Sequence, residues 1–417
     1  MANRALTADV IATASLAILE NELGVIDTFY RAPEDEFSSN VNGYKKGSTI
    51  SIRRPADFTI RSGATMDLQD AIEGKVAFTV DKQKGVDFSF SSTDMTLSIS
   101  DLSTRFLKPA MINLVNEIAA DCMETFYPAV YNWVGTAGST VDSFADFYKA
   151  PERMNEMAIP MSSRYGVLSP ADHAGMLGNL TGLYIQSDAK SAYRNASLGN
   201  IGGVDVQMSQ VVPVHTNGTA DNTTPLTRGT SNSVTYDTAK DTWTMTLSTD
   251  GWDTAATLTA GTVFTIGTGA TGVYMVNPKT KRSTGILQQF VVTESTTAHV
   301  TTSSETPLTI SPPIIVSGPH QTVNAAPGND VAITVVGSDS TAYKQNLVYH
   351  KNAFALAMVP MELPQGAVGA SRKSQNGISI RVIPVYDGVN DVDKWRLDVL
   401  YGRKCIDPRL AVRLSGT

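Results

Sequence analysis

The stretch Trp395-Arg-Leu-Asp-Val-Leu-Tyr-Gly402 carries the clearest strand pattern in the chain. Its apolar side chains recur at every second position, at Leu397, Val399 and Tyr401. An earlier run has the same period of two, with Ile378, Ile380 and Val382. Because alternate side chains share one face of a strand, the two runs predict half-buried strands near the end of the chain.

Two helices are predicted upstream of these strands. The longer one has a continuous apolar face, which consists of Met111, Leu114, Val115, Ile118, Cys122 and Phe126. Pro109 either starts this helix at its first position or kinks a longer helix that begins near Asp101, and Pro128 ends it. A shorter helix is predicted from Ser143 to Met157.

The N-terminal segment is predicted to form a helix from Thr7 to about Glu22, with Thr7 as N-cap and Gly24 as C-cap glycine. Its apolar stripe consists of Val10, Ile11, Ala14 and Ile18. This stripe can dock on its own body or on a neighbouring subunit, and the sequence leaves both open.

Two strand patterns flank a long polar excursion. Thr49 to Arg54 is the first strand, and the second begins where Val76, Phe78 and Val80 alternate. A turn is expected around Gln83 to Gly85, before the alternation returns at Val86, Phe88 and Phe90. Gly47 to Val80 therefore predicts two strands joined by an excursion, which at this length is usually functional or disordered in a compact domain.

Composition changes sharply between about Thr216 and Val336. Thr, Ser, Gly and Val dominate there, and the segment holds five Lys or Arg and eight Asp or Glu in about 120 residues. Short alternating runs follow one another, at Trp243-Thr-Met-Thr-Leu247, Val263-Phe-Thr-Ile266, Val273-Tyr-Met275 and Phe290-Val-Val292. Strands at this spacing predict a small antiparallel barrel or sandwich, inserted into a larger domain.

The composition of the whole chain limits its function. The 417 residues suit two or three domains, and at 18% charged the chain is less charged than most soluble proteins. With a net charge of −7, the chain lacks the excess of Lys and Arg that is typical of tight nucleic-acid binding. Cys122 and Cys405 match neither a zinc spacing nor a disulfide framework, which suits a reducing compartment. With no signal core and no run of roughly 18 apolar residues, we expect a soluble protein away from membranes.

We expect no catalytic residue, no cofactor-binding residue and no metal ligand. Gly267-Thr-Gly-Ala-Thr-Gly272 formally matches the dinucleotide fingerprint, but a strand pattern follows it, so we interpret the glycines as turn residues. Asp172-His173 follows Ser169-Pro170, which we interpret as a turn and helix start instead of a catalytic pair. The histidines have no second ligand at metal spacing; they are His173, His215, His299, His320 and His350.

Three stretches resemble the coat proteins of short-tailed phages of the P-twenty-two type, within the larger Hong Kong ninety-seven capsid fold. They are Trp395 to Gly402 followed by Pro408 and Ala411-Val412; Asn346-Leu-Val-Tyr-His-Lys-Asn-Ala-Phe-Ala-Leu356; and Asn200-Ile-Gly-Gly-Val-Asp-Val206 leading to Val212-Pro213. The order of elements matches over nearly the whole chain. Where family members can carry a long charged loop that crosses a two-fold axis, this chain has the short turn Asp237-Thr-Ala-Lys-Asp241.

The resemblance implies an α+β fold with six segments. They are an N-arm (1–40), an E-loop and peripheral domain with a spine helix (41–136), an axial domain (137–215), an inserted barrel-like β domain (216–336), the axial domain continued (337–370) and the closing strands of the peripheral domain (371–417). Gly47 to Val80 would be the E-loop, which overlaps an adjacent subunit. Lys-Asn crosslinking through Lys45 or Lys46 is not favoured, because such residues are common on any surface.

The resemblance also implies a function, that of a major capsid protein which is structural and non-catalytic. It would self-assemble as pentamers and hexamers into an icosahedral virion shell, inside the host bacterial cytoplasm. Expected partners are a scaffolding protein, a portal at one vertex and packaged double-stranded DNA held without sequence specificity, with no cofactor and no membrane. The alternative is a Thr-rich β surface or tail-fibre-like protein, for which repeats or a trimerising coil would be typical.

Overall fold

The computed structural model describes residues 11–18, 24–31, 33, 49–66, 68–91, 107–180, 198–220, 225–230, 232–298, 304–367, 369–375 and 378–417. The chain divides into two compact units. Unit 1 comprises Met1–Ile52, Ala77–Cys122 and Phe354–Lys404, and unit 2 comprises Arg53–Val76, Met123–Ala353 and Cys405–Thr417. Both units combine helices with sheets, so the expected α+β class is confirmed.

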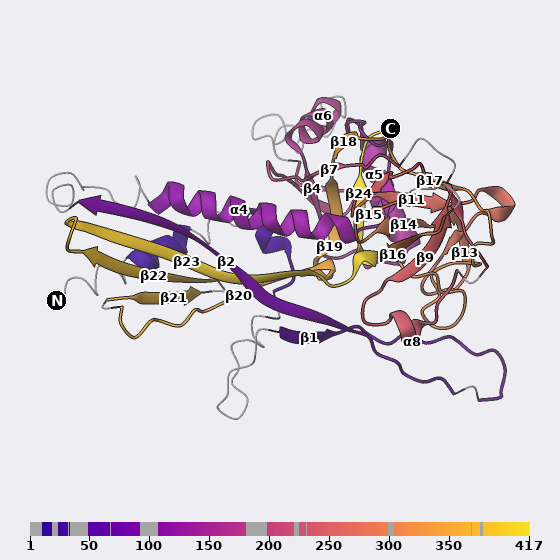
Figure 1. Ribbon diagram of the computed structural model, residues 1–417, viewed down its shortest axis with the longest axis horizontal. Coiled ribbons are helices and arrows are strands. Elements are labelled where there is room, and N and C mark those ends of the chain that lie inside the picture. The colour runs from indigo at the N-terminus through magenta and orange to yellow at the C-terminus, as the bar shows by residue number, and fades with distance from the viewer. Residues whose placement is uncertain are drawn as a thin grey trace. The chain divides into compact units, whose positions relative to one another are not determined.

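Unit 1 is built on a long sheet (Figure 1). Its strand order is β1 (Thr49–Arg53), β2 (Lys75–Ser91), β23 (Val392–Cys405), β22 (Ile378–Asp387) and β21 (Ser371–Gln375), with β20 (Phe354–Val359) also paired to β23. The alternating residues of β22 and β23 are all buried, namely Ile378, Ile380, Val382, Leu397, Val399 and Tyr401. The period of two therefore marked the buried face of both strands correctly.

Strand β2 is continuous, so the turn expected at Gln83 to Gly85 is wrong. The register between β2 and β23 runs without a shift through residues 82–91. Gly85 is required by close approach of the backbones, because a Cβ atom there would lie 2.5 Å from the Leu397 carbonyl oxygen. This glycine therefore marks a tight strand contact.

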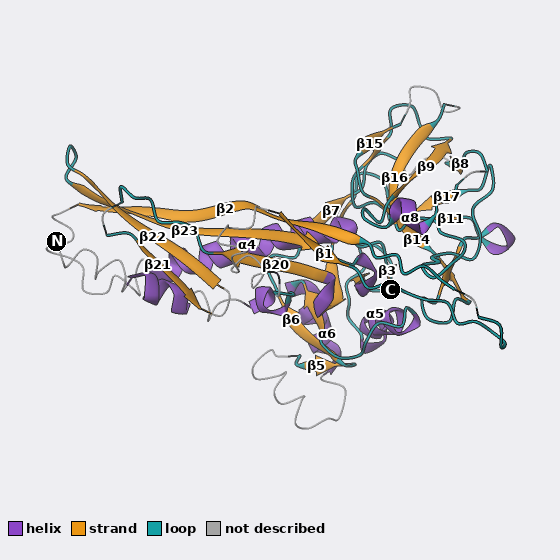
Figure 2. Ribbon diagram, turned by 90° about the horizontal axis from the view of Figure 1, so that it is seen from below, coloured by secondary structure: helices purple, strands orange, loops and turns teal. Residues whose placement is uncertain are grey.

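Helix α4 (Lys108–Phe126) runs beside this sheet (Figures 1 and 2). Every residue of its predicted apolar face is buried. On the other side, the Asp121 carboxylate accepts hydrogen bonds from the Tyr401 hydroxyl at 2.5 Å and from Arg403 Nη2 at 2.7 Å. Pro109 lies in the first turn, and residues 101–106, where the longer alternative would begin, lie outside the described part of the chain.

The N-terminal segment docks on its own unit. Residues 11–18 are helical, whereas the rest of the predicted helix lies outside the described residues. Ile11 and Leu16 are buried, and Gly24, which opens η1 (Gly24–Thr28), has the positive φ of +46° expected of a C-cap glycine. The Tyr30 amide then donates to the Phe354 carbonyl at 2.9 Å, which adds this segment to β20.

Unit 2 contains a second six-stranded sheet. Its order is β3 (Trp133–Val134), β24 (Ala411–Leu414), β19 (Asn346–His350), β4 (Arg164–Leu168), β6 (Val204–Met208) and β5 (Asn200–Ile201), with helices α5 (Phe144–Glu156) and α6 (Pro170–Leu180) beside it. Ser143 caps α5 by accepting from the Asp146 amide at 3.1 Å, as its predicted start requires. Segment 371–417 contributes to both units, with β22 and β23 in unit 1 and β24 in unit 2.

The Thr-rich segment of unit 2 forms a barrel (Figure 2). Its strand order is β17 (Ile333–Val335), β11 (Val263–Ile266), β14 (Gln289–Val292), β16 (Thr306–Ser311), β9 (Met245–Asp250) and β8 (Leu226–Thr227). The two edges meet where the Thr227 amide donates to the Val331 carbonyl at 2.9 Å and the Ile333 amide to the Pro225 carbonyl at 2.8 Å. A closed sheet leaves no edge strand, so of the two predicted architectures the barrel is confirmed.

The barrel joins the rest of unit 2 through a two-stranded neck. Strands β7 (Val214–Thr216) and β18 (Ala342–Lys344) pair antiparallel, so the chain enters and leaves the barrel at one place. Beside the neck, the guanidinium group of Arg413, which is 1% exposed, donates to the Gly261 carbonyl at 2.8 Å and to the Tyr127 carbonyl at 2.7 Å. One buried side chain of β24 therefore connects the second sheet to the barrel at Gly261 and to the backbone at Tyr127.

Candidate assembly site

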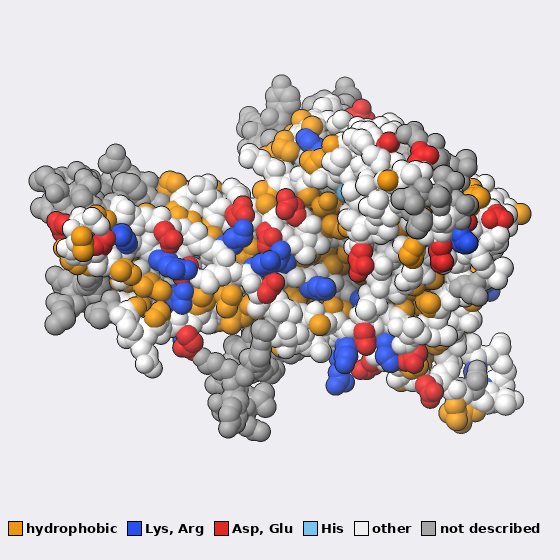
Figure 3. All heavy atoms as spheres, viewed as in Figure 1, with side chains coloured by type: hydrophobic (Ala, Val, Ile, Leu, Met, Phe, Trp, Pro, Cys, Tyr) orange, Lys and Arg blue, Asp and Glu red, His pale blue; other side chains and the backbone are white. Residues whose placement is uncertain are grey.

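Residues 54–74, which we call the arm, connect β1 to β2. The described residues of the arm, 54–66 and 68–74, form no helix or strand. Four of its large apolar side chains face solvent, with exposed fractions of 55% for Phe58, 94% for Ile60, 75% for Met66 and 87% for Leu68. Figure 3 shows hydrophobic side chains at the surface in this region. Apolar side chains gathered on one exposed segment are typical of an interaction site.

The arm begins at a buried arginine. Arg54 is 7% exposed, and its Nε and Nη2 donate to the Ile406 carbonyl at 3.3 and 3.1 Å. Its Nη1 donates to the Lys240 carbonyl at 3.1 Å, and the guanidinium group stands 5.6 Å from the centre of the Trp243 ring. Burial lowers the pKa of Arg54, although the nearby Asp407 carboxylate opposes this shift. These contacts fix the start of the arm.

The arm ends at the same corner of the barrel. The Gly74 carbonyl accepts from the Arg54 amide at 2.8 Å, and the Lys75 amide donates to the Asp241 carboxylate at 2.9 Å. A Cβ atom on Gly74 would collide with the Lys240 carbonyl oxygen, so only glycine fits at this position. The two ends of the arm are therefore held side by side.

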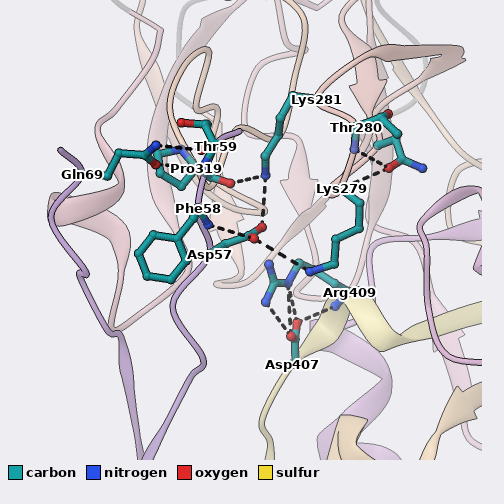
Figure 4. Close-up of polar contacts among 11 residues, drawn as sticks. Asp57, Phe58, Thr59, Gln69, Lys279, Thr280, Lys281, Pro319, Asp407 and Arg409 are labelled. Atoms are coloured by element: carbon teal, nitrogen blue, oxygen red, sulfur yellow. Dashed lines mark hydrogen bonds and ion pairs between the residues drawn. The ribbon is translucent and has the colours of Figure 1, made fainter. Parts of the chain in front are cut away.

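Further along, two polar contacts brace the arm (Figure 4). Thr59 and Gln69 bind each other twice, since the Thr59 amide donates to Gln69 Oε1 at 2.8 Å and Gln69 Nε2 donates to the Thr59 carbonyl at 2.7 Å. The Asp57 carboxylate lies 3.1 Å from Lys281 Nζ and 3.8 Å from Lys279 Nζ. Both lysines belong to the turn between β12 (Tyr274–Val276) and β13 (Ser283–Leu287) of the barrel.

A second charged pair lies beneath the start of the arm. Arg409 Nε and Nη2 donate to the Asp407 carboxylate at 2.9 and 2.7 Å, and the guanidinium group lies 4.8 Å from the Trp243 ring centre. Burial raises the pKa of Asp407, but Arg409 and Arg54 outweigh burial and hold this pKa below its usual range. Asp407 therefore stays ionised and balances the charges of the buried Arg54 and the partly buried Arg409.

The residues considered for chemistry in the sequence have structural partners. Ser169 Oγ donates to the Asp172 carboxylate at 2.5 Å, and that carboxylate also accepts from the Val141 amide at 2.8 Å and from Asn346 Nδ2 at 2.9 Å. Helix α6 begins at Pro170, so the predicted helix start is confirmed. The glycines from Gly267 to Gly272 are followed by strand β12, as their interpretation as turn residues requires.

The described part of the chain has neither a metal-binding cluster nor a membrane-spanning helix. No group of three or more His, Cys, Asp or Glu could hold a metal ion among those residues. None of their helices is long and apolar enough to cross a membrane. His299, Lys45 and Lys46 lie outside the described residues.

The contacts of Arg54, Asp57 and Lys75 could not be found from the sequence. Their partners at positions 240, 241 and 281 are more than 160 residues away along the chain. A polar contact of this range produces no periodic pattern, in contrast to the apolar faces of α4 and β23. The sequence feature that pointed to this site was the length of the segment between the two predicted strands of Gly47 to Val80.

Comparison with solved structures gives distant similarity to structures from phages. A structure of Mycobacterium phage Che8 has a TM-score of 0.48 and 12% identity over 94% of this chain and 91% of that chain. The capsid of cyanophage P-SCSP1u has a TM-score of 0.42 and 9% identity over 95% and 98%. The mature capsid of bacteriophage PhiM1 has a TM-score of 0.41 and 11% identity over 89% and 82%. No curated protein matches the chain.

A family model establishes what the chain is. The class is that of coat proteins, the structural subunits from which a phage builds its shell. The chain belongs to the family described as "P22 coat protein - gene protein 5", whose model matches residues 36–416. It is therefore a major capsid protein, and the alternative of a surface or tail-fibre-like protein is not favoured.

Proposed function

We propose that the arm is the element by which one capsid subunit lies on its neighbour in the shell. The observation that carries this proposal is the exposure of Phe58, Ile60, Met66 and Leu68 on a segment whose base is fixed. Burying one such side chain contributes about 1.5–3 kcal/mol, so a neighbour that covers all four would gain substantial binding energy. A monomer has no use for apolar side chains in this position.

The rest of the proposed function concerns assembly. Copies of the subunit form pentamers and hexamers, and these close into an icosahedral shell with the help of a scaffolding protein and a portal at one vertex. Residues 1–40 serve as N-arm, 137–215 and 337–370 as axial domain, and 216–336 as inserted domain. Assembly takes place in the host bacterial cytoplasm, and the shell has no catalytic role. Family membership supports this assignment.

Packaged double-stranded DNA is held without sequence specificity in this proposal. The net charge of −7 at neutral pH supports it, since a protein that gripped phosphates tightly would carry an excess of Lys and Arg. The enclosed DNA is thus retained by the closed shell more than by direct binding.

The arm is tested by changing its polarity. Replacing Ile60, Met66 and Leu68 together by Ser should leave the subunit folded, because these side chains are exposed, yet should abolish stable shells. The matched control replaces Ile60 by Val, Met66 by Leu and Leu68 by Met, which keeps the surface apolar and should assemble normally. Assembly is followed by light scattering and negative-stain microscopy, and folding by circular dichroism. Normal shells from the Ser variant would rule out the proposed role of the arm.

A further inference from the structure

The barrel concentrates its positive charge where the arm passes. Three of the five Lys and Arg residues of segment 216–336 lie within four positions, at Lys279, Lys281 and Arg282. Two of them, Lys279 and Lys281, face the single carboxylate of Asp57. Side-chain exposure is 17% for Lys281 and 25% for Asp57, so this pair is shielded from water more than an ordinary surface ion pair.

The turn that carries these lysines is itself braced. Asn277 Oδ1 accepts from the amides of Lys279 and Thr280 at 3.0 and 3.1 Å, and Asn277 Nδ2 donates to the Glu156 carbonyl at 2.7 Å. Lys281 has a φ of +54°, which this closed turn imposes. These contacts fix the backbone of the turn, so binding of Lys281 to Asp57 orders the side chains without also having to order the backbone that carries Lys281.

Both ends of the contact have additional partners. Lys281 Nζ also donates to the Pro319 carbonyl oxygen, and Asp57 Oδ1 accepts from the Phe58 amide at 3.1 Å (Figure 4). Burial raises the pKa of Asp57, but Lys281 and Lys279 outweigh burial and keep it below its usual range. The carboxylate next to Phe58, the first large exposed apolar residue of the arm, is thus bound directly to the barrel.

We propose that the turn Lys279–Lys281 is a positioning site for the arm of the same subunit. It holds the arm at Asp57, beyond the anchor at Arg54, and so sets the direction in which the exposed tip meets a neighbouring copy. This inference rests on the proposed function of the arm, and it assigns to the inserted barrel a part in assembly. Without the turn, only the contacts of Arg54 and Gly74 at its two ends would attach the arm to the subunit.

The test uses full-length, unassembled protein and two readouts. The first is hydrogen exchange of the backbone amides of residues 58–73, which reports how firmly the arm is held. The second is the rate of shell assembly by light scattering. Lys281→Asn removes the charge while tolerating the positive φ, and Asp57→Asn removes its partner. Each should raise amide exchange in the arm roughly fivefold and slow assembly by a similar factor, with the thermal midpoint close to wild type.

Two further variants separate positioning from general damage. Arg282→Asn removes an exposed positive charge from the same turn and should change neither readout. Reversing the pair, with Asp57→Lys and Lys281→Asp in a Lys279→Ser background, restores attraction and should recover both readouts. If Lys281 had only a structural role, charge reversal would not restore amide exchange and assembly to their wild-type rates.

Two outcomes would overturn the inference. Unchanged amide exchange in Lys281→Asn would mean that the ion pair does not hold the arm. Faster exchange with normal assembly would mean that the held direction is irrelevant to the shell. Neither outcome affects the apolar tip, whose own Ser variant tests the proposed function separately.

Discussion

His215, in strand β7 of the neck, makes stability depend on pH. The imidazole is 2% exposed, and burial together with the Arg413 charge lowers its pKa to about 4. In the unfolded chain the pKa is about 6.5. The unfolded state therefore binds more protons between these two values, so stability falls as pH drops from 6.5 to 4. The full shift corresponds to about 3 kcal/mol lost by pH 4.

We expect His215→Gln to remove this part of the acid sensitivity. Urea unfolding of the unassembled protein at pH 7 and pH 4 should show a difference smaller by about 3 kcal/mol in the variant than in wild type. Val214→Thr, on an exposed position of the same strand, serves as control and should keep the wild-type difference. An unaltered pH dependence in His215→Gln would assign the acid sensitivity to other groups.

At the scale of residues, the sequence predicted apolar positions well and polar contacts poorly. The apolar face of α4 and the alternating residues of β23 were found because burial repeats with the period of the element. Nothing in the sequence around Arg413 distinguishes it from an ordinary strand residue. Its side chain is nevertheless buried and donates to the carbonyl groups of residues 127 and 261. Such contacts depend on tertiary structure, which local spacing does not encode.

Among the elements, the inserted barrel should fold alone. A fragment of residues 214–344 contains the closed sheet and both strands of the neck, so its ends are already paired. Its length is within the range in which one hydrophobic core suffices. We expect dispersed amide resonances and a cooperative thermal transition. A random-coil spectrum would show that the barrel needs the rest of unit 2.

The core of this fragment offers a quantitative check. Phe290 is fully buried and stacks on Phe264, with ring centres 5.8 Å apart. Phe290→Ala should therefore destabilise the fragment by about 3–5 kcal/mol, measured by urea unfolding. Replacing the exposed Val214 by Ala is the matched control and should cost far less.

The one wrong element shows what sequence patterns leave out. Gln83 to Gly85 has the composition of a turn, but the strand continues because β23 pairs with it without a shift from Lys82 to Ser91. Long-range pairing decided the conformation, and the glycine was needed for backbone approach instead of for a turn. The barrel was easier to predict, since its many short strands lie in one continuous segment.

For the whole molecule, we expect self-association into closed shells or shell fragments. Heterologous contacts between identical subunits produce rings, and rings of two sizes close a shell. Size-exclusion chromatography and negative-stain microscopy of the recombinant protein, with its scaffolding protein supplied, should show capsomers and shells. A monomer that persists at high concentration under these conditions would contradict the expectation.

The order of the strands in unit 2 has a consequence for synthesis on the ribosome. Strands β4 and β6 are made before the barrel, whereas β19 and β24, which complete the same sheet, are made after it. The whole barrel therefore leaves the exit tunnel while its parent sheet still lacks two central strands. Since domains fold as units during translation, the barrel is the first finished body of unit 2, and the nascent chain completes the sheet only after β19 and β24 have been made.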